Sequence, residues 1–235
     1  MPTLLILGHM RSGSSLLLHL LLTNPGITAC GERNSAYKSE RDLDWLELEA
    51  RLRRRAFFKP FRYVADQINH DKFTPNEEVL QHPRVRLLFL VREPIGSISS
   101  LINLTRNFYE EWPAAKVVDY YAQRLTTLAR LGALRSGYAL SITYDALINN
   151  TSAELERIRK FLGLDTGFSE TYKLHDFTGM RGDPSERIRA GRIMKSGSHP
   201  LLEIPPGETE RAQIAYRSYN RSIASFSKTP CSGGS

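Results

Sequence analysis

The start of the chain has the pattern of a β-strand, a glycine-containing turn and an α-helix. A short apolar run ends at Gly8, a polar turn with a second glycine, Gly13, follows, and an apolar helical pattern begins at once. The spacing Gly8-x4-Gly13-x-Ser15 matches the Walker frame GxxxxGKS/T at every fixed position but one. Ser14 stands where the lysine is required, and Arg11 places a cation inside the turn. We therefore expect a loop that binds an anionic group through backbone N–H groups and a helix N-terminus.

The rest of the chain alternates between apolar strand-like segments and helical patterns. Strands are predicted at residues 3–7, 27–30, 85–91 and 138–143, and helices at residues 13–23, 42–58, 75–81, 95–107, 114–134, 152–162 and 208–224. Residues 63–68 are interpreted as one or two helical turns, and the expected N-caps include Thr74, before Pro75, and Ser152. This alternation predicts an α/β fold with a P-loop-type central parallel β-sheet flanked by helices. We expect a single domain over residues 1–226 and a disordered tail over 227–235.

The net positive charge of the chain is compatible with several classes of binding partner. The net charge of +7 suits nucleic acid, a membrane surface or a small polyanion. The cations are scattered except in the segment 51–62, which is either a solvated helix face or a patch that steers anions. No nucleic-acid-binding motif and no membrane-spanning segment is found, so neither partner is expected. Two cysteines without a disulfide framework, histidines without ligand spacing and no secretory signal favour a cytoplasmic protein without a metal.

A second anion-binding signal follows the most apolar strand. Arg92 stands at the end of this strand, Pro94 starts a helix, and Ser100 lies about two turns along that helix. Phosphoryl transfer with Mg²⁺ normally needs the Walker lysine and an acidic residue at a strand end. This chain lacks the lysine in register, and its most apolar strand ends in Arg92 rather than in aspartate. The pattern therefore favours an anionic donor bound without a metal, with Arg11 neutralising charge on the group in transfer. Two anion sites on adjacent strands suggest a nucleotide with phosphates at two positions.

These segments together resemble the sulfotransferase family that uses 3′-phosphoadenosine 5′-phosphosulfate (PAPS). The matching residues are Arg11-Ser12-Gly13-Ser14-Ser15, then Arg92, Pro94 and Ser100, then Tyr144 ahead of Phe161-Leu162-Gly163. The basic segment 187–192 is similar to the family's loop that closes over the nucleotide. The resemblance implies that PAPS, or its product 3′-phosphoadenosine 5′-phosphate (PAP), is bound by Arg11, Ser12, Gly13, Ser14, Ser15, Arg92, Ser100, Tyr144, Arg189 and Arg192.

The resemblance also implies a general base. The segment 28–33 is similar to the end of the second strand in tyrosylprotein, carbohydrate and several bacterial sulfotransferases, where a glutamate takes the acceptor's proton. Glu32 is that glutamate, so the expected catalytic residues are Glu32 and Arg11. A surface carboxylate paired with Arg33 or Lys38 is the structural alternative for Glu32, and His9 and then His175 are less favoured bases.

The acceptor is less readable from the sequence than the donor. Candidate contacts lie in residues 37–61, 105–112 and 168–182, where Phe108, Tyr109 and Trp112 could form an apolar wall or only pack in the core. The short chain favours a small-molecule acceptor, so the resemblance implies sulfuryl transfer from PAPS to a hydroxyl or amine, with release of PAP. The alternatives are a P-loop kinase-like phosphotransferase and a non-catalytic nucleotide- or polyanion-binding module. Nothing in the sequence indicates an oligomeric state.

Overall fold

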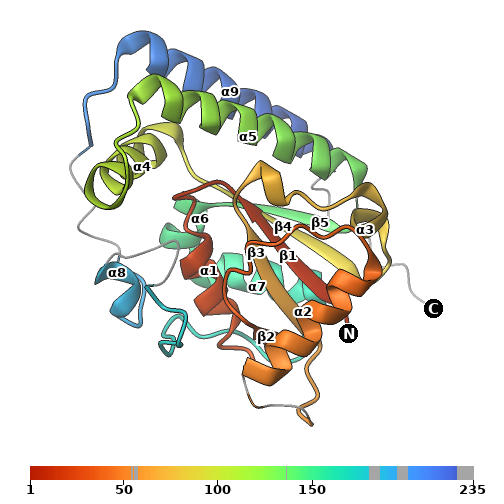
Figure 1. Cartoon of the computed structure of the whole chain (residues 1–235). Coiled ribbons are helices and arrows are strands. Elements are labelled where there is room, and N and C mark those ends of the chain that lie inside the picture. Colours follow the sequence, from red (N-terminus) through yellow and green to blue (C-terminus); the bar gives the residue numbers. More distant parts are fainter. Residues whose placement is uncertain (54, 56–57, 136, 180–185, 195–200, 227–235) are drawn as a thin grey trace.

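A five-stranded parallel sheet with helices on both faces forms the centre of the molecule (Figure 1). The computed structural model describes residues 1–53, 55, 58–135, 137–179, 186–194 and 201–226. The strands, in the spatial order β2-β3-β1-β4-β5, are β1 Thr3–Gly8, β2 Ile27–Ala29, β3 Tyr63–Ile68, β4 Val85–Val91 and β5 Ala139–Thr143. This arrangement confirms the predicted α/β fold with a central parallel sheet.

The central strand β1 brings the two predicted anion-binding segments to one edge of the sheet. It is buried along its whole length, which is typical of a parallel strand covered on both faces. It pairs with β3 on one side and β4 on the other, and Gly8 lies opposite Leu90. The loop after Gly8 and Arg92 therefore leave the sheet side by side. In open parallel sheets the carboxyl ends of the strands form the ligand-binding edge.

The prediction of helical turns at residues 63–68 was wrong. These residues form β3, a fully buried strand between β2 and β1. The sequence is misleading because Asp66 and Gln67 interrupt its apolar pattern, as they would on a solvated helix. In the fold Asp66 is completely buried and accepts hydrogen bonds from the Tyr37 hydroxyl and from the backbone N–H of Arg33. These tertiary partners compensate for burying a carboxyl group inside a sheet.

Most of the other predicted elements are confirmed with small shifts of their ends. The helices are α1 Ser14–Leu21, α2 Glu40–Arg53, α3 Glu77–Gln81, α4 Pro94–Phe108, α5 Ala114–Leu134, α6 Tyr144–Asn149, α7 Thr151–Leu162, α8 Glu186–Arg189 and α9 Pro206–Phe226, with a 3₁₀ turn at Asp71–Phe73. The N-caps of α3 and α7 are Asn76 and Asn150, and the predicted caps Thr74 and Ser152 were wrong. Asn76 is extended because its N–H donates to the carbonyl of Tyr37. The predicted tail 227–235 lies outside the described residues.

Each face of the sheet packs against its own set of helices. Successive side chains of β1 point to opposite faces, so Leu5 and Leu7 join one core and Leu4 and Ile6 the other. The first core is shared with α2, α3, α4, α5 and α9, and the second with α1, α6 and α7. In Figure 1, α5 and α9 run side by side along the top of the molecule. This arrangement fixes the elements that surround the carboxyl edge of the sheet.

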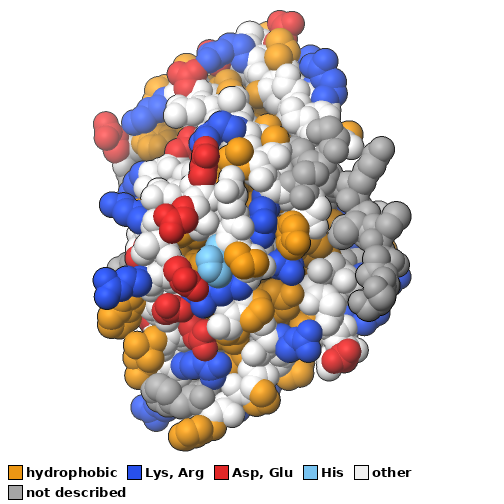
Figure 2. Space-filling view, turned by 90° about the vertical axis from the view of Figure 1, so that its right-hand side faces the viewer, with side chains coloured by type: hydrophobic (Ala, Val, Ile, Leu, Met, Phe, Trp, Pro, Cys, Tyr) orange, Lys and Arg blue, Asp and Glu red, His pale blue; other side chains and the backbone are white. Residues whose placement is uncertain are grey.

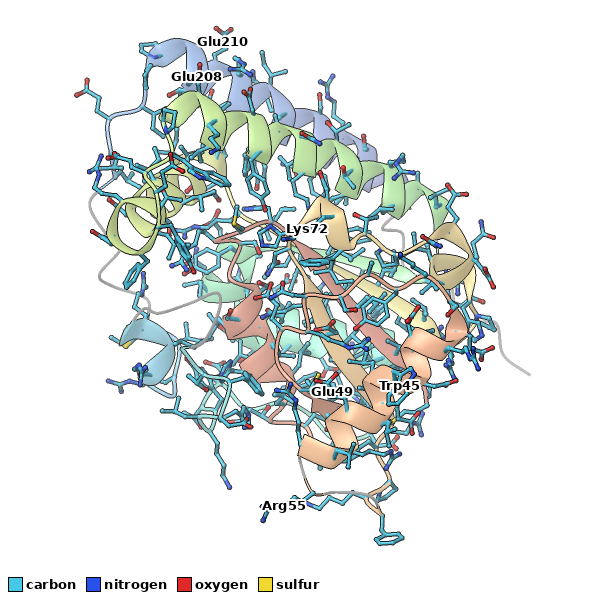
Figure 3. All side chains as sticks on the ribbon, viewed as in Figure 1. Trp45, Glu49, Arg55, Lys72, Glu208 and Glu210 are labelled. Atoms are coloured by element: carbon cyan, nitrogen blue, oxygen red, sulfur yellow. The ribbon has the colours of Figure 1, made fainter. Side chains whose placement is uncertain are left out.

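The surface carries mixed charge rather than one extended basic region. Figure 2 shows acidic and basic side chains interspersed on one face. In the basic segment 51–62, Arg51 and Arg53 lie 3.0 and 2.8 Å from acidic side chains one helical turn earlier on α2. Figure 3 shows one of these acids, Glu49, beside Trp45 on α2 and Arg55 beyond its end. The two arginines thus pair within their own helix, which favours the interpretation of this segment as a solvated helix face.

Three further findings concern the described part of the chain. None of its helices is both long enough and apolar enough to cross a membrane. It contains no group of three or more His, Cys, Asp or Glu side chains that could hold a metal ion. Cys30 is buried as a free thiol, and burial raises its pKa to about 12, so the thiol remains protonated at neutral pH.

Candidate active site at the carboxyl edge of the sheet

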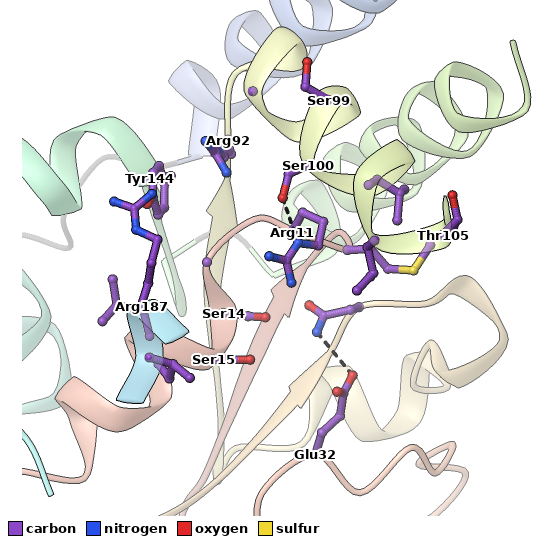
Figure 4. A pocket seen from close by; sticks show the side chains of 18 of the residues that line it. Arg11, Ser14, Ser15, Glu32, Arg92, Ser99, Ser100, Thr105, Tyr144 and Arg187 are labelled. Atoms are coloured by element: carbon purple, nitrogen blue, oxygen red, sulfur yellow. Dashed lines mark hydrogen bonds between the residues drawn. The ribbon is translucent and has the colours of Figure 1, made fainter. Parts of the chain in front are cut away.

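A cavity of about 590 Å³ opens at the carboxyl edge of the sheet (Figure 4). It is bounded by the loop after β1, the ends of β3 and β4, one face of α4, and segments near α6 and α8. Most of the residues predicted for the site line this one cavity, namely Arg11, Gly13, Ser14, Ser15, Glu32, Arg92, Ser100, Tyr144 and Arg192. Residues from five distant parts of the sequence thus meet where a parallel sheet binds its ligands.

The loop after β1 is held in an unusual conformation. Arg11 has a φ of 65°, in the left-handed region that costs a non-glycine residue free energy. Its Nε donates a 2.9 Å hydrogen bond to Ser100 Oγ on α4, which directs the guanidinium across the cavity (Figure 4). Gly13 has a φ of 94°, and a Cβ there would lie 2.5 Å from a ring carbon of Tyr144. The glycine therefore lets the Tyr144 ring pack directly against the loop.

Arg92, the first residue after β4, lines the cavity. Its guanidinium lies 4.5 Å above the centre of the Tyr144 ring, and its backbone is fixed by Tyr121, whose hydroxyl donates to the Arg92 carbonyl at 2.7 Å. The Nε of Arg92 is buried without a hydrogen-bond partner among the described residues, as are the Nε atoms of Arg84 and Arg135 away from the cavity. Arg92 differs from these two because its side chain lines the cavity beside the loop after β1. The Arg92 guanidinium is therefore placed to receive an anion.

Two of the predicted nucleotide-binding residues do not line the cavity. Ser12 is fully buried, and its backbone N–H donates to the carbonyl of His9, so the turn directs this residue into the protein interior. Arg189 is exposed and lies against Gly179, whereas Arg187, on the opposite side of the short helix α8, lines the cavity. A four-residue helix has too few turns to show a periodicity, so the sequence pattern could not indicate which arginine of α8 faces the cavity.

Glu32 faces the cavity from the loop after β2. Its Oε1 accepts a 3.2 Å hydrogen bond from the side-chain amide of Asn69, the first residue after β3 (Figure 4). The next residue, His70, also lines the cavity, and burial lowers the pKa of its imidazole below the usual value, with help from the positive charges of Lys72 and Arg124. A neutral imidazole and a carboxylate thus border the same space. Neither Asn69 nor His70 was predicted, because the strand before them was not recognised.

The loop that carries Glu32 is fixed by the buried carboxyl of Asp66. The Tyr37 hydroxyl donates to Asp66 Oδ2 at 2.5 Å, and the Arg33 backbone N–H donates to Oδ1 at 3.1 Å. Burial raises the pKa of Asp66 to about 6, although the hydrogen bonds oppose that shift. These contacts fix the chain on the C-terminal side of Glu32.

The buried Arg124 of α5 holds the ends of two strands together. Its side chain is completely buried and donates to the carbonyls of Gly8 and Ile68 at 2.8 and 2.6 Å, and it also lies 2.7 Å from Asp71 Oδ1. The neighbouring Tyr120 accepts from the Met10 N–H. The sequence pattern could have indicated a buried role for Arg124, because this charged residue falls among the apolar residues on the buried face of an amphipathic helix.

His9 is a structural residue of the loop. Its Nε2 accepts a 3.1 Å hydrogen bond from the Arg92 N–H, so Nδ1 holds the proton and donates to the carbonyl of Met10 at 2.9 Å. The ring is fully buried and packs edge-on against Tyr121. Burial lowers its pKa to about 4. With both nitrogens occupied, His9 joins β1 to β4 and is not placed to accept a proton from an acceptor.

This burial predicts a pH-dependent stability. As the pH falls from about 6.5 to 4, the unfolded chain protonates His9 and the folded protein does not, so His9 lowers the free energy of unfolding by up to roughly 3 kcal/mol. Asp66 acts oppositely, because its raised pKa favours the folded protein as the pH falls through about 6. The variant His9→Gln should lose less stability between about pH 7 and pH 5 than wild type in urea unfolding. Equal losses in the two proteins would contradict a neutral buried His9.

Comparisons with known proteins agree on one family. Residues 2–170 match the sulfotransferase family model. Over 254 aligned positions the chain is 24% identical to mouse heparan sulfate glucosamine 3-O-sulfotransferase 6, covering 94% of this chain and 70% of that protein. The fold is similar to that of the sulfotransferase domain from the Synechococcus PCC 7002 olefin synthase, with a TM-score of 0.67, 18% identity and 94% of each chain covered. It also resembles mouse sulfotransferase SULT7A1 complexed with PAP, with a TM-score of 0.50, 14% identity, and 97% of this chain and 84% of that chain covered.

Proposed function

The chain belongs to the sulfotransferase family, and from this premise we propose that it transfers a sulfuryl group from PAPS to a hydroxyl or amine of a small-molecule acceptor, releasing PAP. The single observation that carries the proposal most directly is that Arg11, Arg92 and the first turn of α1 border one cavity at the carboxyl edge of the sheet. A nucleotide with phosphate groups at two positions supplies anions for these donors. The PAP bound to the structurally similar mouse sulfotransferase supports the same choice of ligand.

The side chains at one end of the cavity fit an anionic nucleotide. Ser14 and Ser15 begin α1, so their hydroxyls and the N-terminal N–H groups of the helix face an anion there. Three arginines border the same end, namely Arg92, Arg187 and Arg192. Tyr144 also lines this end, and its aromatic ring offers apolar surface to a purine base. In this proposal these residues hold the donor, and Arg11 extends from them toward Glu32.

Arg11 and Glu32 supply the two parts that sulfuryl transfer requires. Glu32 takes the proton from the acceptor hydroxyl or amine while the new bond to sulfur forms. The bond between sulfur and the bridging oxygen breaks, and its electron pair stays on the PAP phosphate. Arg11 stabilises the negative charge that develops on that bridging oxygen. Its 2.9 Å hydrogen bond to Ser100 holds the guanidinium in place before the reaction.

Calorimetry with PAP tests the donor site. Arg92→Ala should weaken PAP binding roughly 10- to 100-fold, because a hydrogen bond to a charged group contributes about 1.5–3 kcal/mol. Arg86→Ala is a matched control, since Arg86 lies on the same strand with its guanidinium 4.7 Å above the ring of Tyr138, remote from the cavity. This control should bind PAP like wild type. An ATP titration with Mg²⁺ tests the phosphotransferase alternative in the same experiment.

Two outcomes would contradict the proposal. The first is a wild-type protein that binds ATP with Mg²⁺ but not PAP. The second is unchanged PAP affinity in the Arg92→Ala variant. Turnover with PAPS should also survive EDTA, because the proposed mechanism assigns every charge-stabilising role to side chains.

A further inference from the structure

The two ends of the cavity differ in charge. The end near α6 and α8 has Arg92, Arg187 and Arg192 and no acidic side chain among its described lining residues. The opposite end has two acids, Glu32 and Glu110, and no described lysine or arginine in its lining. Arg11 lies between the two ends (Figure 4). The arginine-lined end suits the anionic donor, which leaves the acidic end for the acceptor.

The helix α4 passes from the donor end to the acceptor end, and the side chains that it contributes to the cavity lining change from polar to mainly aliphatic along this path. Ser100 bonds to Arg11, and Leu104 follows four residues later on the same helix face, about 6 Å further along the axis. Leu101 and Thr105 complete this part of the lining. The acceptor end thus begins directly beyond the Arg11 guanidinium with aliphatic side chains.

Aromatic side chains border the same end, where Trp112 is half-buried and Tyr109 is 68% exposed. Tyr109 and Trp112 line the cavity after α4, and the backbone N–H of Trp112 donates to the hydroxyl of Thr105 at 3.2 Å, which fixes the loop against the helix. Phe108, the third aromatic residue of this predicted wall, does not line the cavity, because it lies on the outer face of α4 and is 60% exposed. Met10 contributes a further apolar surface beside Arg11.

We propose that the acceptor is an uncharged hydroxyl compound with an apolar body, which lies between α4 and the loop 109–112 and presents its hydroxyl to Glu32. This inference rests on the proposed function and specifies its substrate class. An apolar acceptor would bury its surface against four side chains of this wall, namely Leu101, Leu104, Tyr109 and Trp112. This burial makes the binding free energy more favourable. A sulfated or carboxylated sugar polymer would meet the acids Glu32 and Glu110, while Arg11 is the nearest described cation of the lining. Lys116 lies outside the described lining, with its Nζ 4.4 Å from the centre of the Trp112 ring. Most charges of such a polymer would therefore be unpaired.

The first experiment measures binding to the protein saturated with PAP. By calorimetry, 2-naphthol and 1-octanol should each bind this complex, and an N-sulfated heparan oligosaccharide should bind much more weakly. With PAPS, sulfuryl transfer to 2-naphthol should exceed transfer to the oligosaccharide. The absence of binding by both 2-naphthol and 1-octanol, or faster transfer to the oligosaccharide, would overturn the inference. Failure of PAP itself to bind would instead contradict the proposed function, so the two failures are distinguishable.

Variants test whether this wall selects the acceptor. Leu104→Gln should raise the KM for 2-naphthol at least roughly tenfold and leave the Kd for PAP unchanged, because it places a polar amide against an apolar ligand. Leu48→Gln, on the exposed face of α2, is the matched control and should change neither quantity. Glu110→Lys should increase transfer to the oligosaccharide relative to 2-naphthol. An unchanged KM in Leu104→Gln with intact PAP binding would overturn the assignment of the wall.

Discussion

Replacing Arg11 with glycine is expected to lower kcat by roughly 10²- to 10³-fold, the usual effect of removing one donor that stabilises charge in a transition state. The expected effect on PAP affinity is smaller, since Arg92 and the N-terminus of α1 still hold the nucleotide. Glycine is the sharper choice than alanine, because residue 11 has a φ of 65° and glycine adopts this conformation without strain. The variant thus removes the guanidinium without disturbing the loop, and its Tm should not fall.

Two further variants serve as comparisons for Arg11→Gly. Arg11→Lys should recover only part of the rate, because lysine cannot donate to Ser100 and to a developing charge in the same planar geometry. Arg106→Ala removes an exposed arginine of α4 that pairs with Glu111, and it should leave kcat unchanged. Wild-type turnover in a folded Arg11→Gly variant would show that Arg11 has no catalytic role.

Glu32→Gln is expected to lower kcat by roughly 10²- to 10⁴-fold, the range that general acid–base catalysis supplies. The glutamine keeps an oxygen that can accept the hydrogen bond from Asn69, so the loop and the PAP affinity should be preserved. A general base must be deprotonated, so the fall of kcat on the acid side of the pH profile should disappear together with Glu32. Full activity in this variant would remove Glu32 as the base.

The second titratable group at the acceptor end makes this test more informative. His70 has a lowered pKa because of burial and nearby positive charge, so it is neutral at pH 7 and able to take a proton. If Glu32 is the base, His70→Gln should lower kcat much less than Glu32→Gln does. A larger loss of kcat in His70→Gln would instead identify His70 as the base. Glu78→Gln changes an exposed acid of α3 that does not line the cavity and is the matched control, with kcat close to wild type.

Local sequence patterns were sufficient for the donor end of the cavity. Seven of its residues were predicted by number and line the cavity, namely Gly13, Ser14, Ser15, Arg92, Ser100, Tyr144 and Arg192. A phosphate-binding loop must follow a buried strand and precede a helix, so its residues are contiguous and their spacing is readable. Ser12 and Arg189 belong to the predicted segments but do not line the cavity, so the sequence patterns indicated the segments and not the direction of every side chain in them.

The acceptor end could not be predicted in the same way. Its lining residues come from the ends of β2 and β3, the second half of α4 and the loop 109–112. Because these segments are separated in the sequence, no continuous motif marks this end of the cavity. Asn69 and His70 were not predicted because β3, the strand before them, was not recognised. That strand contains the buried Asp66, which does not fit an apolar strand pattern. The partners of Asp66, Tyr37 and Arg33, lie about thirty residues away in the sequence.

The fold class, the loop that follows Gly8 and the arginine after β4 could be predicted from local patterns, because each depends on residues adjacent along the chain. The three-dimensional fold was needed to show that Arg11 bonds to Ser100, that Arg187 rather than Arg189 lines the cavity, and that Glu32 and His70 border one space. These relations depend on how elements that are distant in the sequence pack against one another. A single buried side chain, Arg124, joins the ends of β1 and β3 and thereby positions both sides of the site.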